Sequence, residues 1–299
     1  MNKIINALIR RYRWYVADPL ARRPFQNLKI MDSFESIQYI IDHRCSISRY
    51  GDGELSFFWG GKVGFQVVDE ELIIRLKNVL QATDAPNHVV GIPYYVKNVD
   101  GTVKITRTFW GDFMRKYGKR LRPFFSDKRT YIDTQISRFY IEYYDRDRST
   151  RQLQMLKQIW EGRDVVIVEG NQSRTGVGND LYSNAKSLHR ILGYSTNGFS
   201  HYDDMLKAIT THVDPKDDKL ILLSYGPTAT ILAYDLAKLA YQAVDIGHLD
   251  IEYEWYQRGD MNGGVVKGKY TNEAMGGNNV EECVDEKYLS QIICDITKK

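Results

Sequence analysis

Helical and extended patterns alternate along the chain from about Ser33 to residue 260. Apolar residues recur at helical spacing in several segments, and short apolar runs separate those segments, so we expect amphipathic helices between buried strands. The expected helices begin at Asp32 or Ser33 and include 69–81, 106–119, 150–161, 181–192 and 228–241. The expected strands are 45–50, 88–93, 164–168, 219–224 and 243–246. Glycine-containing turns at 169–180 and 225–230 lead from strand to helix, which favours an α/β domain with parallel strands.

The N-terminal residues 1–30 follow a different pattern. Ile4, Ile5, Leu8, Tyr12 and Tyr15 recur at helical spacing, and Lys and Arg residues greatly outnumber Asp18, the only acid of the segment. This basic amphipathic helix could lie on an anionic membrane surface, or it could dock on the body with a solvated charged face. Pro19 and Pro24 are expected to form a linker to the α/β domain at 31–260. Residues 261–299 are expected to form a mobile loop, at about 259–279, and a helix, at about 281–296, packed on the same domain.

The composition is that of an ordinary globular protein. Of the 299 residues, 43% are apolar and 26% are charged, and the net charge is only +3, which argues against nucleic acid as the main partner. The cysteines Cys45, Cys283 and Cys294 have neither zinc-ligand spacing nor the pattern of a disulfide framework, so we expect a reducing compartment. No run reaches the roughly 18 apolar residues of a spanning helix, and no cleavable signal is evident. We therefore expect a cytoplasmic protein.

The stretch S-R-Y-G-D-G-E at 48–54 follows the first expected strand of the body. It places Asp52 and Glu54 close together, and two such carboxylates raise each other's pKa unless a cation holds them. Hard divalent cations such as Mg²⁺ and Mn²⁺ prefer carboxylate oxygen and often bridge to substrate phosphates, which Arg49 could also contact. The alternative is an ordinary Gly-Asp-Gly turn.

Polar residues follow the other strands as well, and parallel strands would bring these segments to one edge of the sheet. At 169–180, Ser173, Arg174, Gly176 and Gly178 resemble a phosphate cradle, completed by a helix beginning near Asn179. An ordinary strand-to-helix turn would explain the same glycines. At 225–230, Thr228 and Thr230 offer hydroxyl groups to a ligand, although plain helix capping explains them equally well.

The run at 248–254 is read as a strand with alternating faces. His248, Asp250, Glu252 and Glu254 would share one face, with aromatic and aliphatic residues on the other. One of these polar residues could serve as a general base or as an orienting group. The alternative is a solvated strand edge. Trp59 and Trp255 could stack on a sugar or a base, or pack in the core.

Taken together, R-Y-G-D-G-E, V-E-G-N-Q-S-R-T-G-V-G-N-D-L, Y-G-P-T-A-T and D-I-G-H-L-D-I-E-Y-E-W resemble the motif set of the glycosyltransferases of the GT-D fold type. This bacterial family is linked to building surface glycans and to glycosylating surface proteins. The resemblance spans about residues 33–260. It implies a Rossmann-like α/β domain with a mostly parallel sheet and helices on both faces, a nucleotide-sugar donor, commonly a UDP-sugar, and a divalent metal, often Mn²⁺.

The resemblance also implies roles for residues. The Asp-x-Glu motif falls on Asp52 and Glu54 as metal ligands, and His-x-Asp-x-Glu falls on 248–252, where His248, Asp250 and Glu252 are the candidate catalytic residues. The candidate donor-binding residues are Arg49, Gly51, Ser173, Arg174, Gly176, Gly178, Asn179, Thr228 and Thr230.

The leading hypothesis is a metal-dependent glycosyltransferase that moves a sugar to a glycan, protein-linked or lipid-linked acceptor in cell-surface polysaccharide or glycoprotein assembly. Peripheral membrane contact through residues 1–30 would suit a lipid-linked acceptor. Two alternatives are a metal-dependent phosphohydrolase or phosphotransferase acting on a nucleotide, and a nonenzymatic subunit that binds a nucleotide sugar.

Overall fold

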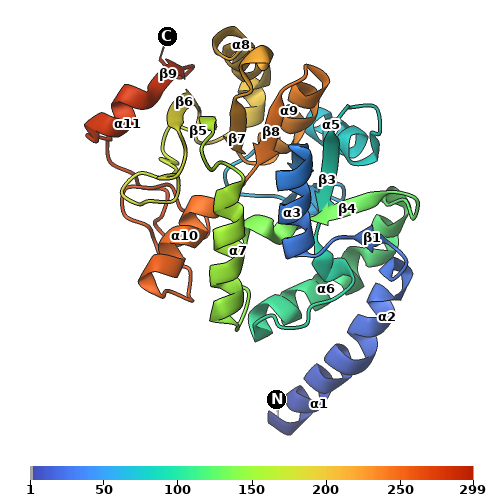
Figure 1. Ribbon diagram of the computed structural model, residues 1–299. Coiled ribbons are helices and arrows are strands. Elements are labelled where there is room, and N and C mark those ends of the chain that lie inside the picture. Colours follow the sequence, from blue (N-terminus) through green and yellow to red (C-terminus); the bar gives the residue numbers. More distant parts are fainter. Residues whose placement is uncertain (1–2, 299) are drawn as a thin grey trace.

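A nine-stranded, all-parallel sheet organises the computed structural model, which describes residues 3–298 without the side chains of Lys3 and Ile4 (Figure 1). The strands are β1 (Lys29–Ile30), β2 (Ser46–Arg49), β3 (His88–Ile92), β4 (Thr130–Asp133), β5 (Asp164–Gly170), β6 (Ser187–Gly193), β7 (Leu220–Ser224), β8 (Gln242–Asp245) and β9 (Ile292–Asp295). Their order across the sheet is β1-β4-β3-β2-β8-β7-β5-β6-β9. The expected parallel α/β fold is therefore confirmed.

The strand order divides the sheet into two halves. Strands β1 to β4 form one half, and β5 to β9 form the other, so the halves meet where β2 pairs with β8 at Ile47 and Val244. A crevice opens at such a switch in strand order, outside the carboxyl ends of the strands. The topology therefore places a ligand site beyond Arg49 and Asp245, the last residues of β2 and β8.

Helices cover both faces of the sheet (Figure 1). Along β5, Val166 and Val168 belong to one hydrophobic cluster, whereas Val165 and Ile167 belong to the other, as expected for a strand buried on both sides. The first cluster includes residues of α5 (Glu70–Gln81), α6 (Lys104–Leu121), α8 (Tyr202–His212) and α9 (Pro227–Lys238). The second includes residues of α3 (Ser33–His43), α7 (Arg146–Gln158) and α10 (Leu249–Arg258). The remaining α-helices are α1 (Lys3–Tyr12), α2 (Asp18–Arg22), α4 (Asp52–Phe57) and α11 (Glu286–Gln291).

The start of α3 follows the expected capping chemistry. The Asp32 carboxylate accepts hydrogen bonds from the backbone N–H groups of Phe34 and Glu35, both at 2.9 Å, and Glu35 accepts one from the Asp32 N–H, also at 2.9 Å. This reciprocal arrangement satisfies backbone donors that the first turn of a helix leaves free. It fixes the start of the helix that leads into β2 and so to the crevice.

Two segments in the C-terminal half of the chain differ from the prediction. Residues 187–192 of the expected helix at 181–192 are instead part of β6, which pairs with β5 over its full length, and residues 171–186 contain turns. The expected strand at 248–254 is instead α10, closed by Gly259 in the left-handed conformation. Both segments are short, and their apolar spacing fits either period, so neighbouring elements decide the conformation. The correction to α10 changes which side chains share a face.

The C-terminal helix is also shorter than expected. The prediction covers 281–296, but α11 ends at Gln291 and the chain continues as β9, which pairs with β6. Residues 259–285 form no helix or strand, and the carboxylate of Asp285 caps α11 by accepting from the N–H of Tyr288 at 2.7 Å.

The N-terminal segment is helical almost throughout. A π-helical stretch, Arg13–Ala17, joins α1 to α2, so Pro19 lies in the first turn of α2 and Pro24 in a short 3₁₀ turn, not in a linker. Proline is tolerated there because the first helical N–H groups have no acceptor within the helix. Residues 1 and 2 of the expected amphipathic segment lie outside the described residues. Within residues 3–298, no helix combines the length and apolar character that a membrane span requires.

Candidate active site

A cleft of about 390 Å³ opens at the carboxyl edge of the sheet, where the two halves meet. It is lined from both halves: Arg49 ends β2, Ser224 ends β7, Asp245 ends β8 and Gly170 ends β5. The first turn of α4 and the loop at 270–273 also contribute to the lining. The expected convergence of strand ends is therefore present.

The acidic pair Asp52 and Glu54 lies in this cleft. Gly51 is the N-cap of α4, and Glu54 accepts a hydrogen bond from the Gly51 N–H at 2.9 Å. Burial raises the pKa of Asp52, with Arg138 opposing the shift. Burial also raises the pKa of Glu54 to about 7, and the charges of Asp245 and Asp52 add to that shift. Neither carboxylate forms an ion pair with a residue in the described part of the chain.

The donor set fits a divalent cation only if the ligand supplies part of the coordination. Across residues 3–298, no group of three or more His, Cys, Asp or Glu side chains is arranged to hold a metal ion by itself. Asp52 and Glu54 nevertheless present carboxylates whose charge is costly because of burial. Magnesium-type ions are often held by one or two carboxylates together with water and substrate phosphates. The acidic pair therefore fits a cation shared with a phosphorylated ligand.

Arg49 spans the boundary between the two halves. Its guanidinium donates to the Asp245 carboxylate at 3.1 Å, to the Thr134 carbonyl at 2.9 Å and to the Ser137 hydroxyl at 2.5 Å. Gly247 has φ +52°, and a Cβ at this position would lie 2.0 Å from Nη2 of Arg49. Only glycine therefore allows the chain to pass so close to this guanidinium.

Arg138 is the second arginine lining the cleft. It donates to both carboxylate oxygens of Glu273, at 2.9 and 3.0 Å, and lies 3.5 Å from Glu142 and 3.6 Å from Glu252. One guanidinium cannot neutralise three carboxylates, of which Glu142 and Glu252 are buried. Burial raises the pKa of Glu142 to about 7 and that of Glu252 to about 8 despite the charge of Arg138. Burial would also raise the pKa of Glu273, but His248 and Arg138 lower it to about 2. Glu273 is therefore the ionised partner.

His248 lines the cleft beside Arg138. Its Nε2 lies 2.5 Å from Nη1 of Arg138, and its Nδ1 lies 3.7 Å from the Glu273 carboxylate. Burial lowers the pKa of His248 to about 4; Glu273 opposes this shift and Arg138 adds to it. The imidazole is therefore neutral near pH 7. Because Arg138 can only donate, Nε2 accepts its hydrogen bond.

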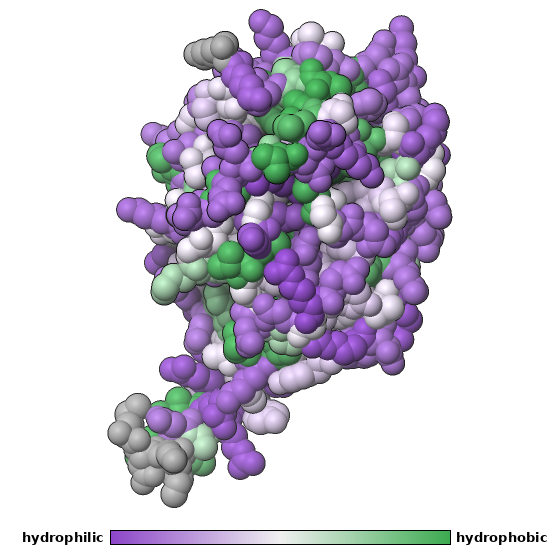
Figure 2. All heavy atoms as spheres, turned by 90° about the vertical axis from the view of Figure 1, so that its left-hand side faces the viewer, coloured by the Kyte–Doolittle hydropathy of each residue, from purple (hydrophilic) through white to green (hydrophobic). Residues whose placement is uncertain are grey.

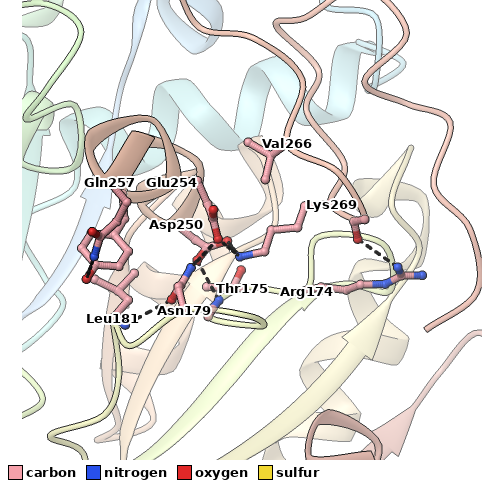
Figure 3. Close-up of polar contacts among 12 residues, drawn as sticks. Arg174, Thr175, Asn179, Leu181, Asp250, Glu254, Gln257, Val266 and Lys269 are labelled. Carbon is pink, nitrogen blue, oxygen red and sulfur yellow. Dashed lines mark hydrogen bonds and ion pairs between the residues drawn. The ribbon is translucent and has the colours of Figure 1, made fainter. Parts of the chain in front are cut away.

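Asp250 and Glu252, the other two candidate catalytic residues, are buried and accept hydrogen bonds from the protein, although Asp250 also lines the cleft and Oε1 of Glu252 has no hydrogen-bond partner. In α10, the Asp250 carboxylate accepts from Nζ of Lys269 at 2.6 Å, from the Gly176 N–H at 2.8 Å and from Asn179 at 2.7 Å (Figure 3). Glu252 has no exposed surface, and one of its oxygens accepts from the N–H groups of Tyr140 and Ile141. These contacts fit positioning roles rather than proton transfer from a bound substrate.

The loop at 170–180 brings only part of the expected cradle to the cleft. Ser173 lines the cleft, but Arg174 extends away from Asp250 and donates to the carbonyl groups of Gly268, at 2.9 Å, and Glu281 (Figure 3). Gly176 and Asn179 hold Asp250, and Gly178 has a positive φ that suits the turn. Because β6 follows instead of a helix, no helix N-terminus faces a ligand from this loop.

The threonines of the segment at 225–230 point into the protein. Thr230 donates to the Arg49 carbonyl at 2.9 Å, which ties α9 to β2, and Thr228 is fully buried. Gly226 and Pro227, at the start of α9, line the cleft instead.

Neither candidate stacking residue lines the cleft. Trp59 stacks on Tyr117 with ring centroids 5.7 Å apart. Trp255 is buried, and its indole N–H donates to the Gly264 carbonyl at 2.7 Å. Both tryptophans therefore serve in packing.

Three charged residues of the cleft are absent from the prediction: Arg138, Asp245 and Glu273. Asp245 is predictable from the sequence, because it is the one charged residue within the apolar run at 243–246 and so lies at the carboxyl end of an expected strand. Arg138 and Glu273 come from segments without clear periodicity, and only the tertiary fold brings them together.

Comparison with known proteins identifies the class. A family profile described as "Glycosyltransferase GT-D fold" matches residues 47–274. The structure superimposes with a TM-score of 0.86 on one described as the domain of unknown function 1792 with a distinct glycosyltransferase fold. The two share 34% identity, and the match covers 93% of this chain and 99% of the other. A second structure is described as a new glycosyltransferase (DUF1792) from Streptococcus sanguinis. It superimposes with a TM-score of 0.82 at 33% identity, and the match covers 90% of this chain and 99% of the other. The protein thus has the α/β fold of the GT-D class of glycosyltransferases.

Two curated relatives agree with this classification. The glycosyltransferase GlyD of Streptococcus pneumoniae is 34% identical, and the probable glycosyl transferase Gly of Streptococcus gordonii is 32% identical, each over 94% of this chain. The matches span only 34% and 40% of the length of those relatives. The chain belongs to the GT-D family of glycosyltransferases, as its motifs predict.

Proposed function

We propose that the cleft binds a nucleotide-sugar donor, with a UDP-sugar as the expected class, together with Mn²⁺ or Mg²⁺ held through Asp52 and Glu54. The sugar would pass to a glycan or glycoprotein acceptor in cell-surface polysaccharide or glycoprotein assembly, in the cytoplasm. The observation that carries this proposal is the acidic pair itself, because burial raises the pKa of both carboxylates in a cleft lined by family motifs.

Sugar transfer requires groups that stabilise negative charge on the leaving diphosphate. Breaking the bond between the sugar and the diphosphate develops charge on the leaving oxygen, and a bound dication would supply Lewis-acid stabilisation of that group. Among the described residues that line the cleft, Arg49 and Arg138 are the cationic side chains. Both are held by neighbouring carboxylates, Asp245 and Glu273. Such preorganised donors favour the transition state because they need little rearrangement.

His248 is the candidate proton acceptor for the acceptor hydroxyl. It is neutral near pH 7 and lines the cleft. In the present arrangement Nε2 accepts from Arg138, so this hydrogen bond would have to break before Nε2 could accept a proton. We assign Asp250 and Glu252 as positioning residues, since their carboxylates hold the 176–179 loop and the 140–141 backbone.

The experiment combines binding and turnover. Thermal stabilisation by UDP-sugars should require Mn²⁺ and should be lost in Asp52→Asn and Glu54→Gln, while Glu71→Gln, an exposed change on α5, should retain it. Equal metal-dependent stabilisation in the two cleft variants would contradict the metal assignment. Release of inorganic phosphate from the nucleotide without sugar transfer would favour the phosphohydrolase, and binding without any turnover would favour the nonenzymatic subunit.

A further inference from the structure

An exposed apolar stripe runs along the N-terminal helical segment. This segment projects from the body, and Figure 2 shows apolar side chains among hydrophilic ones on its end. The members of the stripe are each 41% to 61% exposed and recur at intervals of three to four residues, and they are Ile5, Leu8, Ile9, Tyr12, Val16 and Leu20. In a helix this spacing places them along one side.

Other residues of the segment anchor it to the body. Trp14 lies beneath the guanidinium of Arg107, 5.0 Å from its ring centroid, and the buried carboxylate of Asp18 pairs with Arg115 of α6. The apolar stripe is therefore held outward on a segment whose base is fixed.

A basic cavity of about 490 Å³ adjoins the stripe at Leu20. Its cationic lining residues are Arg22, Arg23, Lys97 and Arg107, and its acidic ones are Asp18 and Asp100. Asp18 is already paired with Arg115. The lining therefore carries more positive charge than its own acids balance.

Arg22 is the most unusual member of this lining. Its residue is 4% exposed, and its Nε donates to the Tyr95 carbonyl at 3.0 Å. Its Nη2 has no hydrogen-bond partner, and Arg22 forms no ion pair with any carboxylate of the described chain. Burial, and next the charge of Arg107, lower its pKa to about 10, so it stays charged at neutral pH. Asp100 in the same lining only partly opposes this shift. A buried charge without a directly contacting carboxylate is costly, and a bound anion would reduce that cost.

We propose that the apolar stripe and the basic cavity form one docking surface for an anionic phospholipid membrane. The stripe would enter the interfacial region of the bilayer, and Arg22 and Arg107 would receive a lipid phosphate. The sign of the charge favours this occupant over a second copy of the chain. Asp18 is the only acid among the first 30 residues, so two such segments would repel each other.

Sedimentation with vesicles tests the stripe. The full chain should bind vesicles of phosphatidylcholine mixed with phosphatidylglycerol, bind pure phosphatidylcholine weakly, and lose binding as salt is raised. The double variant Leu8→Ser, Leu20→Ser should bind at least about tenfold more weakly, because two apolar side chains no longer enter the interface. Leu239→Ser, a 47% exposed leucine outside the stripe, is the matched control. Equal binding by the double variant would overturn the proposal.

Substitution of the arginines tests the cavity. Arg22→Gln keeps a donor for the Tyr95 carbonyl but removes the charge, so its melting temperature in the absence of lipid should equal or exceed that of the natural chain. Its preference for phosphatidylglycerol should nevertheless fall severalfold. Arg107→Gln, which is less buried, should show the same loss, and the exposed Arg151→Gln should not. Destabilisation by Arg22→Gln with unchanged preference in both cavity variants would overturn the proposal.

Two further measurements distinguish a membrane from other partners of this surface. Thermal stabilisation by inorganic phosphate without vesicle binding would assign the cavity to a soluble phosphate compound and overturn the membrane assignment. Self-association that the Leu8→Ser, Leu20→Ser variant loses would assign the stripe to a second copy. All these readouts are independent of sugar transfer, so failure here leaves the proposed function untouched.

Discussion

Two pairs of acidic side chains in this protein differ in whether a cation of the chain contacts them. Asp52 and Glu54 occupy the first turn of α4, and Asp250 and Glu254 lie one turn apart in α10. In α10 the chain supplies its own cation, because Nζ of Lys269 lies 2.6 Å from Asp250 and 2.9 Å from Glu254 (Figure 3). In α4 no described residue forms an ion pair with either carboxylate.

The pKa values of the two glutamates show the difference. Burial raises the pKa of Glu54 to about 7. Burial would raise the pKa of Glu254 too, but Lys269, Asn179 and Arg258 together lower it. An acidic pair with an internal cation is part of the scaffold, whereas a pair without one is available to an external cation. Sequence spacing alone does not separate these cases, and the neighbouring side chains do.

The largest expected effect comes from removing the internal cation. Lys269→Met leaves the buried Asp250 without its cation, whereas Glu254 keeps Arg258 at 2.9 Å, so the free energy of unfolding should fall by about 3–5 kcal/mol. Urea denaturation measures this change. Lys267→Met, at an exposed lysine two residues earlier, is the control and should change stability little. A fully stable Lys269→Met variant would remove the distinction between the two pairs.

The next effect concerns turnover. Asp52→Asn should lower the rate of sugar transfer by roughly 10²–10³-fold, the size of one strong electrostatic interaction in a transition state. Its stability without metal should be unchanged or higher, because a buried charge is removed. Steady-state kinetics and urea denaturation of the same preparation measure both quantities. Wild-type turnover in this variant would show that the α4 pair is as structural as the α10 pair.

The pH dependence of stability should differ in sign between the pairs. Because the pKa of Glu54 is raised from 4.5 to about 7, its contribution favours the folded state at low pH and is lost as pH rises through that window. In metal-free protein, the free energy of unfolding should therefore fall by roughly 1–3 kcal/mol as the pH rises through this window. This fall should be absent in Glu54→Gln. Glu254 has a lowered pKa, so its contribution is present above 4.5 and lost on acidification. Denaturation at several pH values in a chelator checks both signs.

The smallest expected effect tests whether Arg174 binds a phosphate, as its motif predicts, or holds the 259–285 segment. Arg174→Gln removes donors from the Gly268 and Glu281 carbonyl groups and should cost about 1–3 kcal/mol of stability. Donor affinity, measured by calorimetry, should stay the same because this guanidinium does not line the cleft. A large loss of donor affinity at unchanged stability would restore the phosphate-binding role predicted from sequence.

Much of the fold and part of the candidate site follow from the sequence. The strand at 45–50, its acidic turn and the convergence of strand ends were predictable, because buried parallel strands are apolar and ligands gather at their carboxyl ends. The predictions for β6 and α10 are wrong because stretches of seven to ten residues fit both the helical and the strand period. The roles of Arg174 and Lys269 depend on the 259–285 segment folding back against the 170–180 loop and α10, which no local pattern indicates.

The place of β9 at the edge of the sheet matters during synthesis. Strand β6 is complete at Gly193, yet its outer edge gains a partner only when residues 292–295 have been made. Until then a ribosome-bound chain presents the unpaired hydrogen-bonding groups of β6, a surface on which other extended segments can add. Translation that stops before residue 292 should therefore yield protein prone to edge-to-edge aggregation, even though every residue lining the cleft has already emerged.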